Sequence, residues 1–185
     1  FHCWVDWRIR RSKIPSMKKL IEYFQVQRHL AVAITLICIS ALAAAYTSQY
    51  GFGLKPCILC LYQRVPYFIN IAVGLLALLA SFKHHKLAVL LLWLSALVFF
   101  ANALIAGFHS GVEYGWWKGL PSCGGDILPV NATLERLRQA LTHQEIVRCD
   151  KAAWTMFGIS MAGYNYILSM GLGIGVVYLL WSNKK

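Results

Sequence analysis

Two pairs of cysteines are the residues of this chain whose type and spacing point to chemistry. Cys57 and Cys60 stand two residues apart in the stretch KPCILCLYQR, and Arg64 follows four residues after the second of them. Thiols at this spacing can form a redox centre, supply half of a zinc site, or be two buried cysteines. Cys123 and Cys149 form a second pair, with 25 residues between them. The elements that carry these side chains decide among the three readings.

The composition places the chain in the membrane class. Only 14% of its residues are charged, 58% are hydrophobic, and the mean hydropathy is +0.55, whereas soluble domains average about 25% charged residues. A helix that crosses a bilayer needs about 20 mostly apolar residues. Four uncharged runs are long enough, at about 30–50, 65–82, 87–108 and 163–181. They predict an all-α membrane protein, a single four-helix transmembrane bundle over residues 29–182.

The net charge of +11 is explained by membrane topology. Of the 18 Lys and Arg residues, eleven lie before the first run, between the second and third runs, or after the fourth run. Basic residues in short connections stay in the cytoplasm. We therefore expect residues 1–28 and the tail 183–185 to be cytoplasmic and the loops 51–64 and 109–162 to lie outside. The basic balance then gives no reason to expect a nucleic-acid partner.

The N-terminal segment raises the question of where the protein starts. Met17 is a candidate start, with residues 1–16 as an upstream extension that contains Cys3. A cleaved signal peptide also places a basic segment before an apolar one. We expect no cleavage, because the apolar run is long enough to span the membrane and no small-residue cleavage site precedes a mature soluble domain. Cys38 falls inside the first span, where a thiol usually packs as a small apolar group.

The predicted topology puts both cysteine pairs outside the cytoplasm, where thiols meet an oxidising environment. Zinc becomes improbable, because Cys123 and Cys149 are far apart and have no adjacent His in the usual register. A disulfide across two residues closes too small a ring to stabilise a fold much, which favours a reactive Cys57–Cys60 pair. A helix that starts here would favour thiolate through its dipole and through Arg64 on the same face as Cys60. Arg64 has the alternative reading of an interfacial anchor.

The long outer loop has a mixed character. Trp116 and Trp117 suit the membrane interface, and the leucines of NATLERLRQALTHQEI recur at helical spacing, which predicts a short amphipathic helix on the bilayer or on the bundle. A disulfide between Cys123 and Cys149 would contribute about 3 kcal/mol as a static crosslink, so a purely structural role stays open. In the last span, GLGIG has the GxxxG spacing of Gly171 and Gly175, which predicts close helix packing.

Three stretches in order resemble the disulfide bond formation protein B (DsbB) family of bacterial inner-membrane oxidoreductases. They are PCILCLYQR before the second span, HSGVEYGWWKGLPSC ending at Cys123, and CDKAAWTMFGISMAGYN before the last span. The resemblance covers the chain from about Lys18 to Trp181. It implies a protein that reoxidises a periplasmic thioredoxin-like dithiol oxidase of the disulfide bond formation protein A type and passes the electrons to a membrane quinone, ubiquinone or menaquinone.

The resemblance also implies a role for each site residue. Cys123 of a Cys123–Cys149 disulfide would be attacked by the partner, the electrons would pass through a Cys57–Cys149 bond, and Cys60 would reduce the quinone. Arg64 would lie beside the quinone and the Cys60 thiolate, and His109 would approach the quinone. The alternatives are a non-catalytic membrane protein with disulfide-crosslinked loops and a Cys-lined metal protein. We expect no resident metal and no nucleic acid.

Overall fold

The computed structural model describes residues 17–120 and 148–182, with side chains from residue 25 onward. Cys3, Cys123 and the predicted amphipathic helix of the outer loop lie outside the described residues. Four long helices form a bundle, as the sequence predicted. They are α1 (Met17–Tyr50), α3 (Arg64–Ala80) preceded by the short α2 (Ile58–Tyr62), α4 (His85–Glu113) and α6 (Met161–Ser182). Each of the four segments that contain them is long and apolar enough to cross a membrane: Gln25–Tyr50, Ile58–Ala80, His85–Glu113 and Met161–Ser182.

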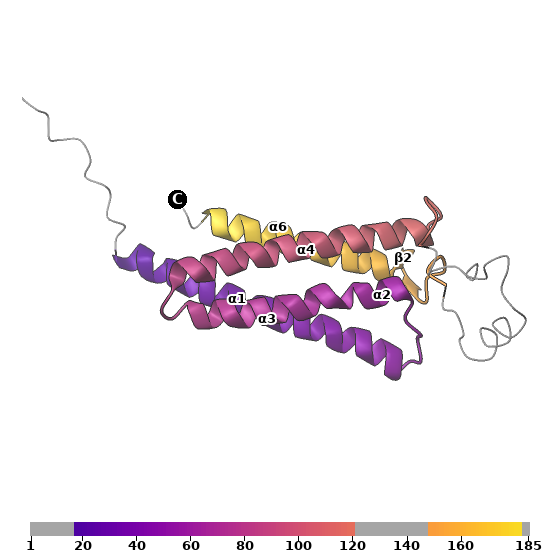
Figure 1. The fold of residues 1–185 in the computed structure, drawn as a ribbon, viewed down its shortest axis with the longest axis horizontal. Coiled ribbons are helices and arrows are strands. Elements are labelled where there is room, and N and C mark those ends of the chain that lie inside the picture. The colour runs from indigo at the N-terminus through magenta and orange to yellow at the C-terminus, as the bar shows by residue number, and fades with distance from the viewer. Residues whose placement is uncertain (1–16, 121–147, 183–185) are drawn as a thin grey trace, which may run out of the picture.

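Helix α4 packs on α6 and on α3, and α3 packs on α1. The start of α1, the turn between α3 and α4, and the end of α6 gather at one end of the bundle, and α2 lies at the other (Figure 1). We call the end that carries α2 the cysteine end. Towards it, α1 diverges from α6 (Figure 1). The charged residues Arg28, Lys83 and Lys86 belong to the opposite end.

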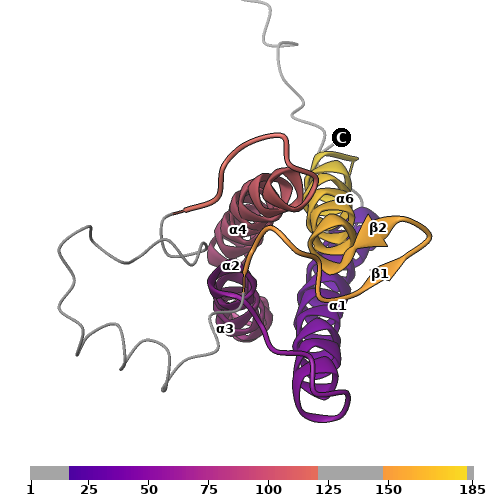
Figure 2. The ribbon, with the colours of Figure 1, turned by 90° about the vertical axis from the view of Figure 1, so that its right-hand side faces the viewer.

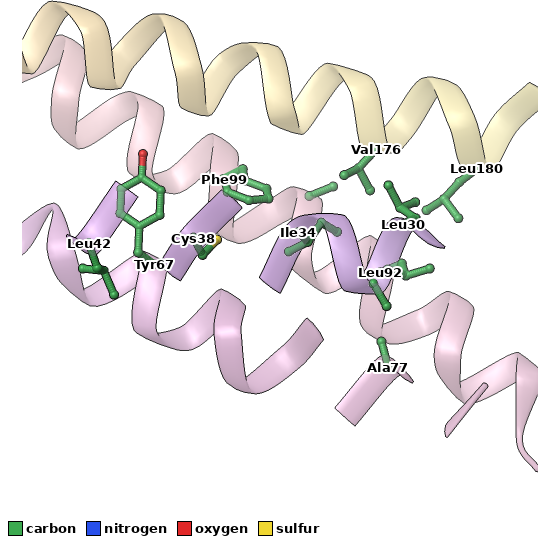
Figure 3. Close-up of a cluster of buried hydrophobic side chains, with 12 residues drawn as sticks. Leu30, Ile34, Cys38, Leu42, Tyr67, Ala77, Leu92, Phe99, Val176 and Leu180 are labelled. Atoms are coloured by element: carbon green, nitrogen blue, oxygen red, sulfur yellow. The ribbon is translucent and has the colours of Figure 1, made fainter. Parts of the chain in front are cut away.

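The packed centre of the bundle takes apolar side chains from all four helices (Figure 3). Phe99 and Leu92 of α4, Ile34 of α1 and Val176 of α6 are each at most 3% exposed. Cys38 is fully buried in the same cluster and is a free thiol, as expected for a thiol that packs as an apolar group. Many outward-facing side chains are large, apolar and exposed, which suits a surface in contact with lipid tails.

Glycine packing in the last span differs from the prediction. A Cβ atom added at Gly171 or Gly175 meets no other atom within 4 Å, whereas one added at Gly173 lies 3.0 Å from the ring of Phe100. The expectation that the GxxxG pair packs closely was wrong. Successive helical residues turn by about 100°, so Gly173 points almost opposite to its neighbours two positions away. It is Gly173 that allows α6 to approach α4.

Two local signals shape the cysteine end. Pro66 has no N–H and its ring would clash with the carbonyl of residue 62 four positions earlier, so the helix is interrupted at Gln63, between α2 and α3. A hairpin of β1 (Thr155–Met156) and β2 (Ile159–Ser160) precedes α6 and projects sideways from the bundle (Figure 2). Phe157 and Gly158 both have positive φ at its turn, as a primed hairpin turn requires. No pattern in the sequence predicted this hairpin.

Candidate active site

Cys57 and Cys60 form a close pair of free thiols at the start of α2. Cys57 is the N-cap residue of that helix, with φ −75° and ψ 171°, and its Sγ accepts the backbone N–H of Cys60 at 3.4 Å. The two sulfur atoms are 3.2 Å apart, and neither belongs to a disulfide. Cys57 is 5% exposed, whereas Cys60 is half-buried. The two thiols of this pair therefore have different surroundings, since Cys57 is the more buried and Cys60 the more exposed.

His109 of α4 lies against the buried member of the pair. Its Nε2 atom is 3.4 Å from Cys57 Sγ, and its Nδ1 atom is 2.7 Å from Nε2 of Gln63. The amide nitrogen of a glutamine only donates, so Nδ1 of His109 accepts and its Nε2 atom carries the ring hydrogen. That hydrogen points at the Cys57 sulfur, which receives it best as a thiolate.

The hydrogen-bond chain continues from Gln63 into the bundle. Asn165 of α6 donates from Nδ2 to Gln63 Oε1 at 2.6 Å, and the hydroxyl of Tyr67 donates to Asn165 Oδ1 at 2.5 Å. Asn102 and Ser169 pack on the same amide and bond to each other at 2.9 Å. From Tyr67 through Asn165 and Gln63 to His109, each residue donates a hydrogen bond to the next, and the last donor is directed at the Cys57 sulfur. Each bond therefore polarises the next one.

These contacts decide the charge state of Cys57. The hydrogen bond from Cys60 has the largest effect, and the hydrogen bond from His109 adds to it; together they outweigh burial and lower the pKa of the Cys57 thiol to about 4. Hydrogen bonds to an ionised form favour that form. At neutral pH Cys57 is therefore a thiolate, the form that acts as a nucleophile. The sequence predicted thiolate character for this pair, but it did not predict which of the two cysteines is the thiolate.

Arg64 begins α3 and is held by two side chains of α1. Its Nη1 atom donates to Gln49 Oε1 at 2.8 Å, and its guanidinium carbon lies 4.7 Å from the ring centroid of Tyr46. A cation over an aromatic face is attracted by the ring quadrupole. Arg64 is thus half-buried with protein partners, which an arginine that only snorkels to headgroups does not need.

A cavity of about 290 Å³ opens where α1 and α6 diverge. Its wall is mainly apolar and comes from both helices, for example from Ala41, Leu42, Ala45, Met161, Ala162 and Leu168. Its polar lining includes Cys60, Gln63, Arg64 and Asn165. An apolar cleft with a few converging polar groups is the usual form of a small-molecule site. His109 is not among the residues that line it.

Cys149 lies beside the dithiol. It is fully buried in a cluster with Cys57, Leu59 and Val112, and it is disulfide-bonded. Cys123, its predicted partner, is outside the described residues. The structure thus brings together Cys57, Cys60, Arg64 and Cys149 from the predicted site. It places His109 against the Cys57 sulfur, a contact that spacing did not predict.

Several polar residues of this site were given no role from the sequence. Gln63 belongs to the cysteine motif, but neither its spacing nor that of Asn165 and Gln49 predicted a role in the site. Glu113, which was assigned no role, has a side chain only 6% exposed, and its Oε1 atom is 3.7 Å from His109 Nε2. A usable signal was present, because polar side chains within membrane spans are rare and mark functional sites.

The fold and the site define a class of protein: a multi-pass membrane protein with a dithiol centre between a buried disulfide-bonded cysteine and an apolar cavity. The family model described as disulfide bond formation protein DsbB matches residues 27–179. The match covers most of the chain. The chain therefore belongs to the DsbB family, a family of thiol oxidoreductases, as the sequence motifs indicated.

Similar proteins span nearly the same length. The chain is 30% identical to disulfide bond formation protein B 2 of Pseudomonas savastanoi pv. phaseolicola, over 86% of this chain and 91% of the relative. It is 28% identical to disulfide bond formation protein B of Methylococcus capsulatus, over 81% and 92%. An uncharacterized protein of Rickettsia prowazekii is 32% identical, over 89% of this chain and 95% of the relative. The chain thus spans more than 90% of the length of each of these relatives.

Proposed function

We propose that this protein is a quinone-dependent thiol oxidase of the bacterial inner membrane, which reoxidises a periplasmic thioredoxin-like dithiol protein of the disulfide bond formation protein A type. The observation that carries the proposal is the position of the free Cys57–Cys60 dithiol. On one side it contacts disulfide-bonded Cys149, and on the other it opens into the apolar cavity beside Arg64. A dithiol in this position can exchange with the cysteines of the disulfide on one side and deliver its two electrons to an acceptor in the cavity on the other.

The residues present fit a membrane quinone. The long apolar wall between α1 and α6 suits a ring with a hydrocarbon tail, and the guanidinium of Arg64 offers a donor to a carbonyl oxygen at one end. Arg64 is fixed by Gln49 and Tyr46, so the donor is already oriented. When bound, the quinone accepts two electrons and two protons. We propose that Arg64 orients its head and that His109 acts through Cys57.

The proposed electron path uses thiol–disulfide exchange throughout. The reduced partner attacks Cys123 of the Cys123–Cys149 disulfide, and the thiol of Cys149 is released as the mixed disulfide forms. The released Cys149 thiolate attacks Cys57 of the Cys57–Cys60 pair in its disulfide form, which gives a Cys57–Cys149 disulfide and frees Cys60. The second thiol of the partner then displaces Cys123 from the mixed disulfide, and Cys123 displaces Cys57 from Cys149. The partner leaves as a disulfide, the Cys123–Cys149 bond is restored, and Cys57 and Cys60 hold the two electrons as the dithiol, from which an acceptor in the cavity would take them. A thiol of low pKa is a good leaving group in exchange, and Cys57 has a low pKa. The net reaction converts one partner dithiol and one quinone into a disulfide and a hydroquinone.

The orientation in the membrane is part of the proposal. The opposite end of the bundle from the dithiol carries Arg28, Lys83 and Lys86, and basic residues at helix ends favour the cytoplasm. Both termini would then be cytoplasmic and the cysteine end periplasmic. A membrane-impermeant maleimide applied to intact spheroplasts should label a cysteine introduced at Gly53 and fail to label one introduced at His84. Labelling of His84→Cys alone would reverse the orientation.

A direct assay tests the activity. Purified protein is mixed with a reduced thioredoxin-like partner and a soluble quinone, and the quinone absorbance is followed. We expect the wild type to consume quinone and partner dithiol in equal amounts, while Cys57→Ser and Cys60→Ser consume neither. If the two variants reduce quinone at the wild-type rate, the oxidase proposal fails. Cys38→Ser is the matched control, because that thiol is buried in the core away from the cavity.

A further inference from the structure

The dithiol is accompanied by a nitrogen and an oxygen donor from α4. Cys57 Sγ, Cys60 Sγ and His109 Nε2 all lie within 4.8 Å of one another, and Glu113 Oε1 is 3.7 Å from that nitrogen. Spacing along the sequence argued against zinc, because no second pair of ligands stands near the first. The fold supplies that second pair. We propose that the reduced pair, with His109 and Glu113, binds zinc or a similar thiophilic divalent cation and that this ion holds the dithiol out of reaction.

Three of the four donors, those of Cys57, Cys60 and His109, lie close to the geometry of a tetrahedral zinc site. Zn–S bonds of about 2.3 Å and Zn–N or Zn–O bonds of about 2.0–2.2 Å imply roughly 3.8 Å between two sulfurs, 3.6 Å between sulfur and nitrogen, and 3.4 Å between nitrogen and oxygen. The corresponding separations are 3.2 Å, 3.4 Å and 3.7 Å. Two adjustments remain. The two sulfurs must part, which Cys60 can do because it is half-buried at the cavity, and the Glu113 carboxylate, which lies outside the close group of the other three donors, must turn towards the sulfurs.

The carboxylate of Glu113 has an oxygen atom, Oε2, that could bind a cation. Its side chain is 6% exposed, and its Oε2 atom is buried with no hydrogen-bond partner. The hydroxyl of Ser160 bonds to the same carboxyl group and limits its rotation. Because Cys57, Cys60 and Glu113 line the cavity, an ion can reach these three donors from that side. A buried carboxylate oxygen that lacks a donor is a natural ligand for a metal ion.

Gln63 is the outer partner of this site and yields a directional test. Binding of an ion at His109 Nε2 requires the ring hydrogen on Nδ1, so the group facing Nδ1 must accept. Gln63 now donates there from Nε2 at 2.7 Å, and a half-turn of its amide, matched by a half-turn of the Asn165 amide that now donates to Gln63 Oε1, would present the oxygen instead. A carboxylate in this position is the usual support of a metal-bound histidine. Gln63→Glu should therefore tighten metal binding, whereas Gln63→Leu should weaken it about ten- to a hundredfold.

The chemistry is metal exchange for protons and involves no electron transfer. Cys57 is already a thiolate and the Cys60 thiol loses its proton, two metal–sulfur bonds form, and the sulfurs stay at the thiol oxidation level. A sulfur held in this way can neither attack a disulfide nor reduce an acceptor. A Cys57–Cys60 disulfide has no thiolate to offer, so the site exists only in the reduced protein. The inference goes beyond the proposed function and does not depend on it.

Cobalt(II) is the probe, because thiolate–cobalt charge-transfer bands and intense visible bands report tetrahedral sulfur ligation. The purified full chain, reduced and kept free of oxygen, is titrated with cobalt and then with zinc. At neutral pH we expect one cobalt per chain, its displacement by zinc, release of one proton from Cys60, and no such bands in the oxidised protein. Cys57→Ser, Cys60→Ser and His109→Ala should abolish the bands or raise the Kd more than tenfold. His84→Ala, in the turn at the opposite end, should match the wild type.

Two further measurements keep the test independent of folding and of activity. Each variant is checked for an unchanged melting profile, and zinc protection of Cys57 and Cys60 against iodoacetamide is quantified by mass spectrometry. Bands that survive in Cys57→Ser, or a reduced protein that binds cobalt no better than the oxidised one, would overturn the proposal. Quinone reduction is measured on metal-free samples, so its absence defeats the oxidase proposal alone, while missing cobalt binding defeats this inference alone.

Discussion

The hydrogen bond from His109 to Cys57 leads to a prediction about acidity. In His109→Leu the imidazole is replaced by an apolar group of similar size, and Cys57 loses a donor at 3.4 Å. Hydrogen bonds to charged groups are worth about 1.5–3 kcal/mol, and one pKa unit corresponds to about 1.4 kcal/mol. We therefore expect the pKa of Cys57 to rise by roughly one to two units. The hydrogen bond from Cys60, which is the larger cause of the shift, remains.

The effect has a defined pH window. The pKa of Cys57 in the wild type is about 4, so its thiolate is nearly complete at pH 5 and is lost only as the pH falls through 4. With the pKa raised to roughly 5–6 in His109→Leu, half or more of the thiolate is lost near pH 5, while little changes at pH 8. The variant should thus react more slowly than the wild type in acid and equally fast in weak base.

The assay is the rate of alkylation of Cys57 by iodoacetamide between about pH 3.5 and 8, since only the thiolate reacts. The modified peptide is quantified by mass spectrometry, which separates Cys57 from Cys60. His109→Gln retains an amide donor and should fall between the wild type and His109→Leu. An unchanged midpoint in His109→Leu would refute the role of the imidazole. A shift in His109→Gln as large as that in His109→Leu would show that the shape of the ring, and not its donor, matters.

Two further predictions concern the cavity and the helix packing. Arg64→Leu should raise the KM for quinone about ten- to a hundredfold, which corresponds to the loss of a charge-assisted hydrogen bond. Gln49→Leu should raise the KM less, because Arg64 then keeps its charge and loses only its hydrogen-bond partner. The measurement is steady-state kinetics with a soluble quinone, and KM values equal to that of the wild type in both variants would contradict the prediction. Gly173→Val should lower the melting temperature by several degrees, because its added Cβ would lie 3.0 Å from a ring of α4. Gly175→Val is the control and should leave the melting temperature unchanged. Equal melting temperatures for the two variants would show that α6 does not approach α4 at Gly173.

Hydropathy, charge pattern and short motifs were enough to predict the membrane spans, the reactive cysteine pair and the family of this protein. Four apolar runs suffice to predict four spans, because a backbone in lipid must satisfy its own hydrogen bonds and does so as a helix. The pair Cys57 and Cys60 and the nearby Arg64 come from one short stretch, so their proximity follows from helical geometry alone. The family could be identified from the same stretch and two others. These features depend on residues close together in the chain.

The tertiary structure decided which distant residues meet. His109 contacts Cys57 across 52 positions, and Asn165 contacts Gln63 across 102. Hydropathy does not reveal these contacts, because lipid tails are as apolar as a packed helix face and leave no pattern that marks which face is inward. For the same reason the sequence indicated Gly171 and Gly175 where the fold uses Gly173. The sequence contains the reactive pair, whereas the packing of α4 and α6 around it determines which sulfur is the thiolate and forms the cavity beside it.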